Sequence, residues 1–146
     1  RYVPNSNHSM ADTDIYDSVD AWYHSIVHNV KLPRYSWNLA DDGTITVLSL
    51  DKPNQVLLWQ AHNPESRNFT QEIIGKAYTS SLLNEAEPGV YKVKLDPPER
   101  GYTAYYIEMH YPSGIETPFK FSSGVKVVPD TTEYTWEFKP DSARSK

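Results

Sequence analysis

The sequence contains no cysteine, and this absence excludes disulfides, thiolate nucleophiles and cysteine-based zinc sites. Its six glycines are scattered through turns, so no glycine-rich loop is present to bind a phosphate. No apolar run approaches the roughly 20 residues that a membrane-spanning helix requires, and we expect no membrane span. The 14 basic residues against 19 acidic ones give a formal charge of −5, which argues against a nucleic-acid partner.

Aromatic residues and prolines are abundant instead. The 146 residues include 11 tyrosines, 4 tryptophans and 11 prolines, which is typical of an aromatic-rich β-domain with many turns. The length suits one domain with a real core and a short extra segment. The chain begins at Arg1 inside what is predicted to be a short strand, Arg1 to Val3. We therefore expect the natural N-terminus to lie upstream.

One amphipathic helix is predicted over residues 13–30. Asp12 or Thr13 can cap its N-terminus, and Pro33 prevents its continuation. Apolar residues recur at spacings of four, three and four and so share one face: Ile15, Val19, Trp22 and Ile26. Because a lone helix is not stable in water, we expect this face to dock on another part of the protein.

From Arg34 onward the side-chain period changes from about 3.6 residues to about 2. The predicted strands are Tyr35–Leu39, Thr44–Leu50, Gln55–Ala61, Tyr78–Leu83, Val90–Leu95, Tyr102–Tyr111 and Phe119–Val128. In the last of these, Phe119, Phe121, Val125 and Val127 are predicted to share a face. Tyr134–Lys139 is predicted as an additional edge strand. This pattern favours a mainly β fold: an immunoglobulin/fibronectin-III-like antiparallel β-sandwich preceded by one amphipathic α-helix.

A histidine in the loop before the helix is the sharpest local feature. It ends the run Tyr2-Val3-Pro4-Asn5-Ser6-Asn7-His8. In an α/β-hydrolase the triad histidine follows the serine and the acid in the chain. It lies on a loop after the last strand, from which its imidazole acts as general base toward a serine on another strand. Taken alone, a polar loop histidine is more often merely solvated.

Several longer runs occur in the order and spacing of a known family. They are Arg1 to His8, Lys31 to Trp37, Asp42 to Ile45, Leu58 to Pro64, Tyr102 to Tyr105, Tyr111 to Gly114 and Phe119 to Pro129. Together, over about residues 1–130, they resemble the PhoPQ-activated pathogenicity-related protein family. That family also takes in secreted autocrine proliferation repressors, and its members look like α/β-hydrolases with an appended C-terminal β-domain.

The resemblance implies a division of the chain and a role for one residue. Residues 1–33 would be the C-terminal strand, histidine loop and helix of an α/β-hydrolase-like domain. Residues 34–130 would be the immunoglobulin-like sandwich, and residues 131–146 a C-terminal extension. His8 would occupy the triad histidine position, with its partners upstream. The protein would be exported, and we expect it to be secreted or periplasmic.

Other residues have two interpretations each. His24 and His28 are four residues apart on the helix and could bind a metal, but surface histidines are favoured, and we predict no metal and no other cofactor. Tyr102, Tyr106 and His110 share a strand face that we expect to be partly solvated, and they form a possible ligand platform, although most aromatics in a sandwich belong to its core. Asn68 begins an N-glycosylation sequon.

Three functional hypotheses follow. In the first, the chain is the C-terminal fragment of an exported serine hydrolase, is not catalytic alone, and has the missing N-terminal hydrolase-like domain as its partner. In the second, the sandwich is a binding or signalling module that recognises a glycan or a cell-surface protein, and the hydrolase domain is degenerate. In the third, the sandwich only stabilises its neighbour. The residues upstream of Arg1 would discriminate between them.

Overall fold

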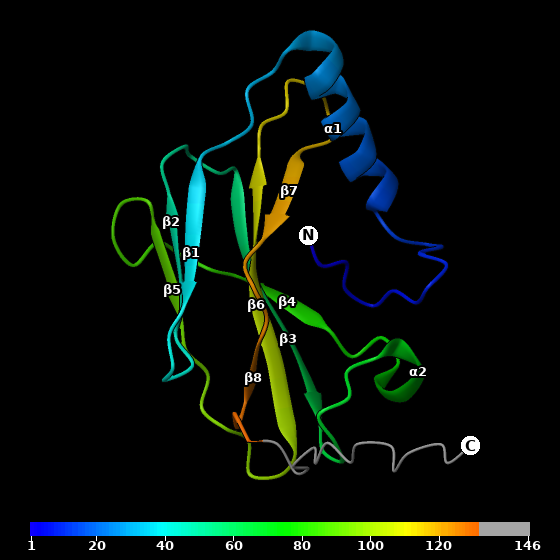
Figure 1. Ribbon diagram of the computed structural model, residues 1–146, viewed down its shortest axis with the longest axis vertical. Helices are drawn as coiled ribbons and strands as arrows, with labels where there is room; N and C mark the ends of the chain where they lie inside the picture. Colours follow the sequence, from blue (N-terminus) through cyan, green and yellow to red (C-terminus); the bar gives the residue numbers. More distant parts are fainter. Residues whose placement is uncertain (132–146) are drawn as a thin grey trace, which may run out of the picture.

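The structure is a computed structural model that describes residues 1–131. The predicted edge strand Tyr134–Lys139 and all of the predicted extension beyond residue 131 lie outside the described residues. Figure 1 shows two packed β-sheets, with a helix lying along one side of them near one end of the molecule.

Eight strands in the described residues form two antiparallel sheets. One sheet has the order β1-β2-β5, and the other has the order β4-β3-β6-β7, with β8 also paired to β6 (Figure 1). The strands are β1 (Tyr35–Leu39), β2 (Ile45–Ser49), β3 (Gln55–Asn63), β4 (Thr79–Leu82), β5 (Val90–Val93), β6 (Tyr102–Tyr111), β7 (Phe119–Ser122) and β8 (Lys126–Val128). The predicted mainly β sandwich behind one helix is confirmed. The neighbours β3, β6 and β7 correspond to strands C, F and G of an immunoglobulin-like domain.

The core lies between the two sheets and is built on alternate residues of β6. Tyr105, Ile107, Met109 and Tyr111 are fully buried, as their period-2 spacing predicts. Around them pack Ile45, Val47, Val56, Leu58, Tyr91, Phe119 and Val128. The two buried tyrosine hydroxyls have partners, since that of Tyr105 donates to the Gly43 carbonyl at 2.6 Å and that of Tyr111 lies 2.6 Å from Ser49 Oγ. These pairs meet the requirement that buried polar groups be hydrogen-bonded.

The predicted strand Phe119–Val128 is interrupted at Ser123 and Gly124, which separate β7 from β8. The Ile107 amide donates to Ser123 Oγ at 3.0 Å, and the Ser123 amide donates to the Ile107 carbonyl at 2.9 Å. The interruption shifts the alternation by one residue, so Val128 enters the core while Val125 lies beside the N-terminal segment. The prediction that Val125 and Val127 continue the face of Phe119 is therefore wrong.

The helix α1 (Ile15–His28) is two residues shorter at each end than predicted. Asn29 ends it in the left-handed conformation, with φ of 52°. Its buried residues are the small Ala21 and Ser25, which allow close approach to β7. A second helix, α2 (Gln71–Ile74), is a single turn before β4. Within the described residues, neither helix is long and apolar enough to cross a membrane.

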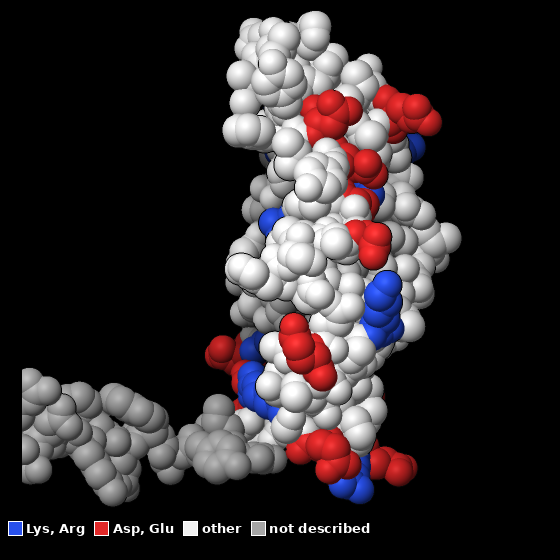
Figure 2. Space-filling model, turned by 90° about the vertical axis from the view of Figure 1, so that its right-hand side faces the viewer, with Lys and Arg blue, Asp and Glu red and all other residues white. Residues whose placement is uncertain are grey.

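The predicted apolar face of α1 does not dock on the sandwich. Val19, Trp22 and Ile26 are 52%, 57% and 58% exposed. We call the exposed apolar side of the helix the outer face of α1; it comprises Tyr16, Val19, Trp22, Tyr23, Ile26 and Val27. Figure 2 views the side of the molecule that carries α1 and α2, where acidic groups flank a largely uncharged surface. A surface with this many large exposed apolar side chains is unusual for a free monomer.

Residues 1–14 lie across the outer side of the five-stranded sheet, the side that faces away from the core (Figure 1). The prediction of a strand at Arg1 to Val3 is wrong, because these residues join no ladder. Instead the Tyr2 amide donates to the Ser122 hydroxyl at 2.9 Å, and the Tyr2 ring lies 5.7 Å from that of Tyr106. The N-terminal segment therefore covers the sheet through side chains.

Candidate functional site

Besides the hydrogen bond of the Tyr2 amide, the loop that carries His8 is fixed to the sandwich at two points. The side-chain amide of Asn5 forms a reciprocal pair with the backbone of Tyr78, donating to its carbonyl and accepting from its amide, each at 2.9 Å. The Ser6 hydroxyl donates to the Val3 carbonyl at 2.8 Å and closes the turn. The second point is Arg1, which is held by two carboxylates. The backbone before His8 is thus fixed although it is not part of a strand.

Arg1 sits in a network of charges, which we call the Arg1 network and which comprises Arg1, Asp14, Glu108, His110 and Lys120. Its guanidinium donates to both oxygens of Asp14, at 2.7 and 2.8 Å, and through Nε to Glu108 at 3.1 Å. Lys120 Nζ donates to Asp14 at 2.5 Å. Because Asp14 is the N-cap residue of α1 and Lys120 belongs to β7, the network joins the N-terminal segment, the helix and the sheet.

Glu108 is the buried centre of this network and is 2% exposed. Its other oxygen lies 2.8 Å from Nε2 of His110 and accepts from the Trp59 indole at 3.3 Å. Burial raises the pKa of Glu108, but the hydrogen bond from His110 and the charge of Arg1 outweigh it, so the pKa lies below its ordinary value. Burial also raises the pKa of Asp14, but the hydrogen bonds from Arg1 and Lys120 outweigh it, so this pKa too lies below its ordinary value. Both carboxylates are therefore ionised at neutral pH.

The expectation that the Glu108 face of β6 is partly solvated is wrong. Tyr102, Tyr106 and Glu108 are all buried. The N-terminal segment covers Tyr106 and Glu108 in the middle of this face. Of the three residues predicted as a ligand platform, Tyr106 lines a pocket, and His110 lies against Glu108. Tyr102 is not among the residues that line that pocket. The sequence pattern does not predict burial of this face, because the segment that covers it lies about a hundred positions away in the chain.

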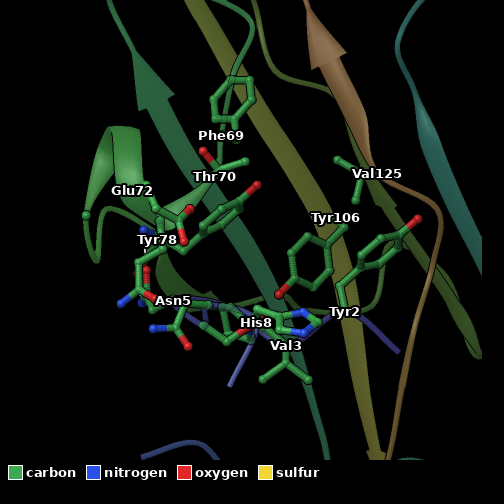
Figure 3. A pocket seen from close by; sticks show the side chains of 15 residues that line it. Tyr2, Val3, Asn5, His8, Phe69, Thr70, Glu72, Tyr78, Tyr106 and Val125 are labelled. Carbon is green, nitrogen blue, oxygen red and sulfur yellow. Dashed lines mark hydrogen bonds between the residues drawn. The ribbon is translucent and has the colours of Figure 1, made fainter. Parts of the chain in front are cut away.

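His8 lies at a pocket of about 390 Å³ between the N-terminal segment and α2. Figure 3 shows the Tyr106 ring between those of Tyr78 and Tyr2, with its hydroxyl directed toward the loop that carries His8. The imidazole of His8 is exposed and makes no hydrogen bond to any described residue. No described carboxylate therefore orients it, and no described hydroxyl is hydrogen-bonded to it.

The backbone around His8 holds an unusual number of left-handed residues. Asn5, Met10 and Asp12 have φ of 53°, 51° and 57°. Asparagine and aspartate tolerate this conformation, but for methionine it is uncommon. Such residues cost free energy and tend to occur at functional sites. The observation favours a functional role for the loop.

The other predicted residues lie apart from this pocket. His24 and His28 have ring centroids 4.4 Å apart, beside a separate hollow that also includes Glu116. Among residues 1–131, no group of three or more histidines or carboxylates is placed to hold a metal. Asn68 is exposed in the loop before α2, and its side-chain oxygen accepts from the Thr70 amide at 3.1 Å. Its glycosylation stays a prediction.

Fold and site together define an immunoglobulin-like sandwich that carries a helix and a fixed histidine loop on the outer side of one sheet. Residues 1–70 match the family model of the PhoPQ-activated pathogenicity-related protein, which confirms the resemblance seen in the sequence. The match extends from the histidine loop through α1 and the first three strands.

One curated relative aligns with almost the whole chain. The chain is 27% identical over 160 residues to autocrine proliferation repressor protein A of Dictyostelium discoideum, an alignment that covers 92% of this chain and 32% of that protein. The chain thus spans about a third of the length of the curated relative it matches. No solved structure matches the chain.

Proposed function

We propose that this chain is the C-terminal region of an exported α/β-hydrolase-type serine hydrolase, in which His8 acts as the triad histidine. The serine and the acid would come from residues upstream of Arg1. The observation that carries the proposal is the unpaired, exposed imidazole of His8 on a loop fixed at both Asn5 and Arg1. A general base must be held rigidly yet keep its ring nitrogens available for a nucleophile and an orienting carboxylate.

The exposed outer face of α1 is an argument that a preceding domain is the partner of this chain. Six large apolar residues of one helix are exposed together, and burying such a surface is favourable at roughly 25 cal/mol per Å². In the proposed arrangement the hydrolase-like domain covers this face while the Arg1 network holds the opposite side of the helix on the sandwich. Residues 1–33 would then belong to both parts and fix their relative orientation. Export to the periplasm or the outside of the cell is part of the proposal and rests on the family resemblance.

The second candidate is a binding or signalling module with a degenerate hydrolase domain. It is favoured by the name of the relative, which describes that protein as an autocrine repressor of proliferation. In this case the sandwich would recognise a glycan or a protein at a cell surface, and His8 would have no serine partner.

A fluorophosphonate probe distinguishes the two candidates, because it reacts covalently with a serine activated by a histidine. Applied to the complete protein, it is expected to label one serine upstream of Arg1, within a Gly-x-Ser-x-Gly-like turn. The heat-denatured protein is the control and should not react. Absence of labelling in the folded protein would contradict the hydrolase proposal and favour the binding module.

A further inference from the structure

We infer that the pocket beside α2 binds a neutral, hydroxyl-rich ligand, namely one or two sugar units held by Tyr106 and Gln71. The inference goes beyond the proposed function, because binding here does not require His8 to be catalytic. It rests on two unpartnered polar atoms, on the aromatic walls of the pocket and on the charges around it.

The two polar atoms are the hydroxyl of Tyr106 and Oε1 of Gln71. Among the described residues, these are the two buried side-chain polar atoms without a hydrogen-bond partner. Both residues line the same pocket, although one belongs to β6 and the other to α2. Leaving a buried polar atom unpaired is unfavourable, so a ligand that supplies both partners is stabilised there. Gln71 Oε1 requires a donor, and the Tyr106 hydroxyl can donate or accept.

The walls of the pocket are aromatic. The ring centroids of Tyr2 and Tyr78 lie 5.7 and 6.2 Å from that of Tyr106, at interplanar angles of 47° and 54° (Figure 3). The ring of Tyr106 is covered by these two neighbours, and the rings of Tyr2 and Tyr78 give the pocket apolar faces on which the C–H groups of a sugar ring can pack. Tyr2 is half exposed, so part of its ring faces the solvent, and the Tyr106 hydroxyl is directed toward the loop that carries His8 (Figure 3).

The charges that line the pocket and the volume of the pocket favour a small, neutral ligand. No lysine or arginine lines the pocket, which disfavours phosphate or carboxylate groups. Glu72 is the one carboxylate among the lining residues and is exposed, so no buried negative charge is present to bind an ammonium group. Burial, followed by the charge of Glu108, raises the pKa of Tyr106 and keeps its hydroxyl protonated. The volume of about 390 Å³ lies at the lower end of the range for small-molecule sites.

Calorimetric titration of the complete protein tests the inference. The probes are methyl β-glucoside, methyl α-mannoside, methyl β-galactoside, N-acetylglucosamine and cellobiose, together with a Gly-Ser tetrapeptide. At least one sugar is expected to bind saturably. Tyr106→Phe and Gln71→Met should each weaken that binding by about 3- to 10-fold, because each removes one hydrogen bond and leaves the packing in place.

Matched controls are Tyr35→Phe and Gln55→Met, which make the same changes at residues that do not line the pocket and should leave sugar binding unchanged. Tyr106→Phe deletes an unpartnered buried hydroxyl, so its melting temperature should not fall, and lost binding cannot be attributed to misfolding. Saturable binding by none of the sugars overturns the inference. So does binding that survives both pocket substitutions, and so does tetrapeptide binding that depends on these residues while no sugar binds.

Discussion

Replacing His8 by alanine in the complete protein is expected to lower esterase turnover of a p-nitrophenyl ester by about a thousandfold or more. Removal of the general base from a catalytic triad has effects of at least this size, because the serine is then no longer deprotonated during attack. The side chain of His8 makes no hydrogen bond to the described residues, so the substitution should leave the melting temperature unchanged.

The matched control for this experiment is His62→Ala. His62 is also exposed, and its one described polar contact is a long one, 3.4 Å from Nδ1 to the Thr103 hydroxyl. Its replacement should leave turnover unchanged. Turnover of the His8→Ala protein within about threefold of the native value would remove the catalytic assignment, whatever the labelling experiment finds.

Glu108→Gln is expected to destabilise the protein by about 3 kcal/mol, because it removes the buried one of the two carboxylate charges that pair with the largely buried Arg1 guanidinium. The amide NH2 of glutamine would also face the donors of Arg1 or His110, so the loss of charge is accompanied by a loss of hydrogen bonds. The control Glu65→Gln breaks an exposed pair with Arg100 and should change the free energy of unfolding by less than about 0.5 kcal/mol. Urea unfolding measures both, and a change below about 1 kcal/mol for Glu108→Gln would show that the network contributes little.

The same substitution should alter the pH dependence of stability. The pKa values of Asp14 and Glu108 are lower in the folded protein than their ordinary values of 3.8 and 4.5. The contribution of these two carboxylates to the free energy of unfolding is therefore fully present when the pH is above those ordinary values. It is lost as the pH falls from there through the lower pKa values of the folded protein. Urea unfolding between pH 7 and pH 2 should show a smaller decrease in stability for Glu108→Gln than for the native protein. Equal decreases would mean that Glu108 is not held in its ionised form by this network.

The sequence predicted the sandwich because its strands follow a local rule. Tyr105, Ile107, Met109 and Tyr111 recur with period 2, and burial of that face follows from spacing alone. The break in the last predicted strand could not be predicted in this way. At the break, Ser123 is hydrogen-bonded to Ile107, and a Cβ atom on Gly124 would lie 2.9 Å from Leu39 and 3.1 Å from the indole ring of Trp37. Nothing local to Ser123 and Gly124 in the sequence indicates these neighbours.

The candidate site was predicted only in part, for a similar reason. The polar loop before a helix indicated His8, since loop, helix and chain order are local features. Arg1 and Glu108 are 107 positions apart, and a glutamate that shares a strand face with a tyrosine and a histidine is ordinarily a solvated one. The pocket residue Gln71 belongs to a helix of a single turn, which is too short to show a period. These parts of the site depend on contacts between residues that are far apart in the chain, and no local pattern predicts such contacts.

The account depends on His8 meeting a serine that lies outside this chain. The most direct test is a crystal structure of the complete protein after reaction with a fluorophosphonate. We expect one ring nitrogen of His8 to lie within about 3 Å of the modified serine and the other to donate to a carboxylate, with the outer face of α1 covered by the same domain. An imidazole of His8 that remains in solvent, with no serine or carboxylate in contact, would contradict the account.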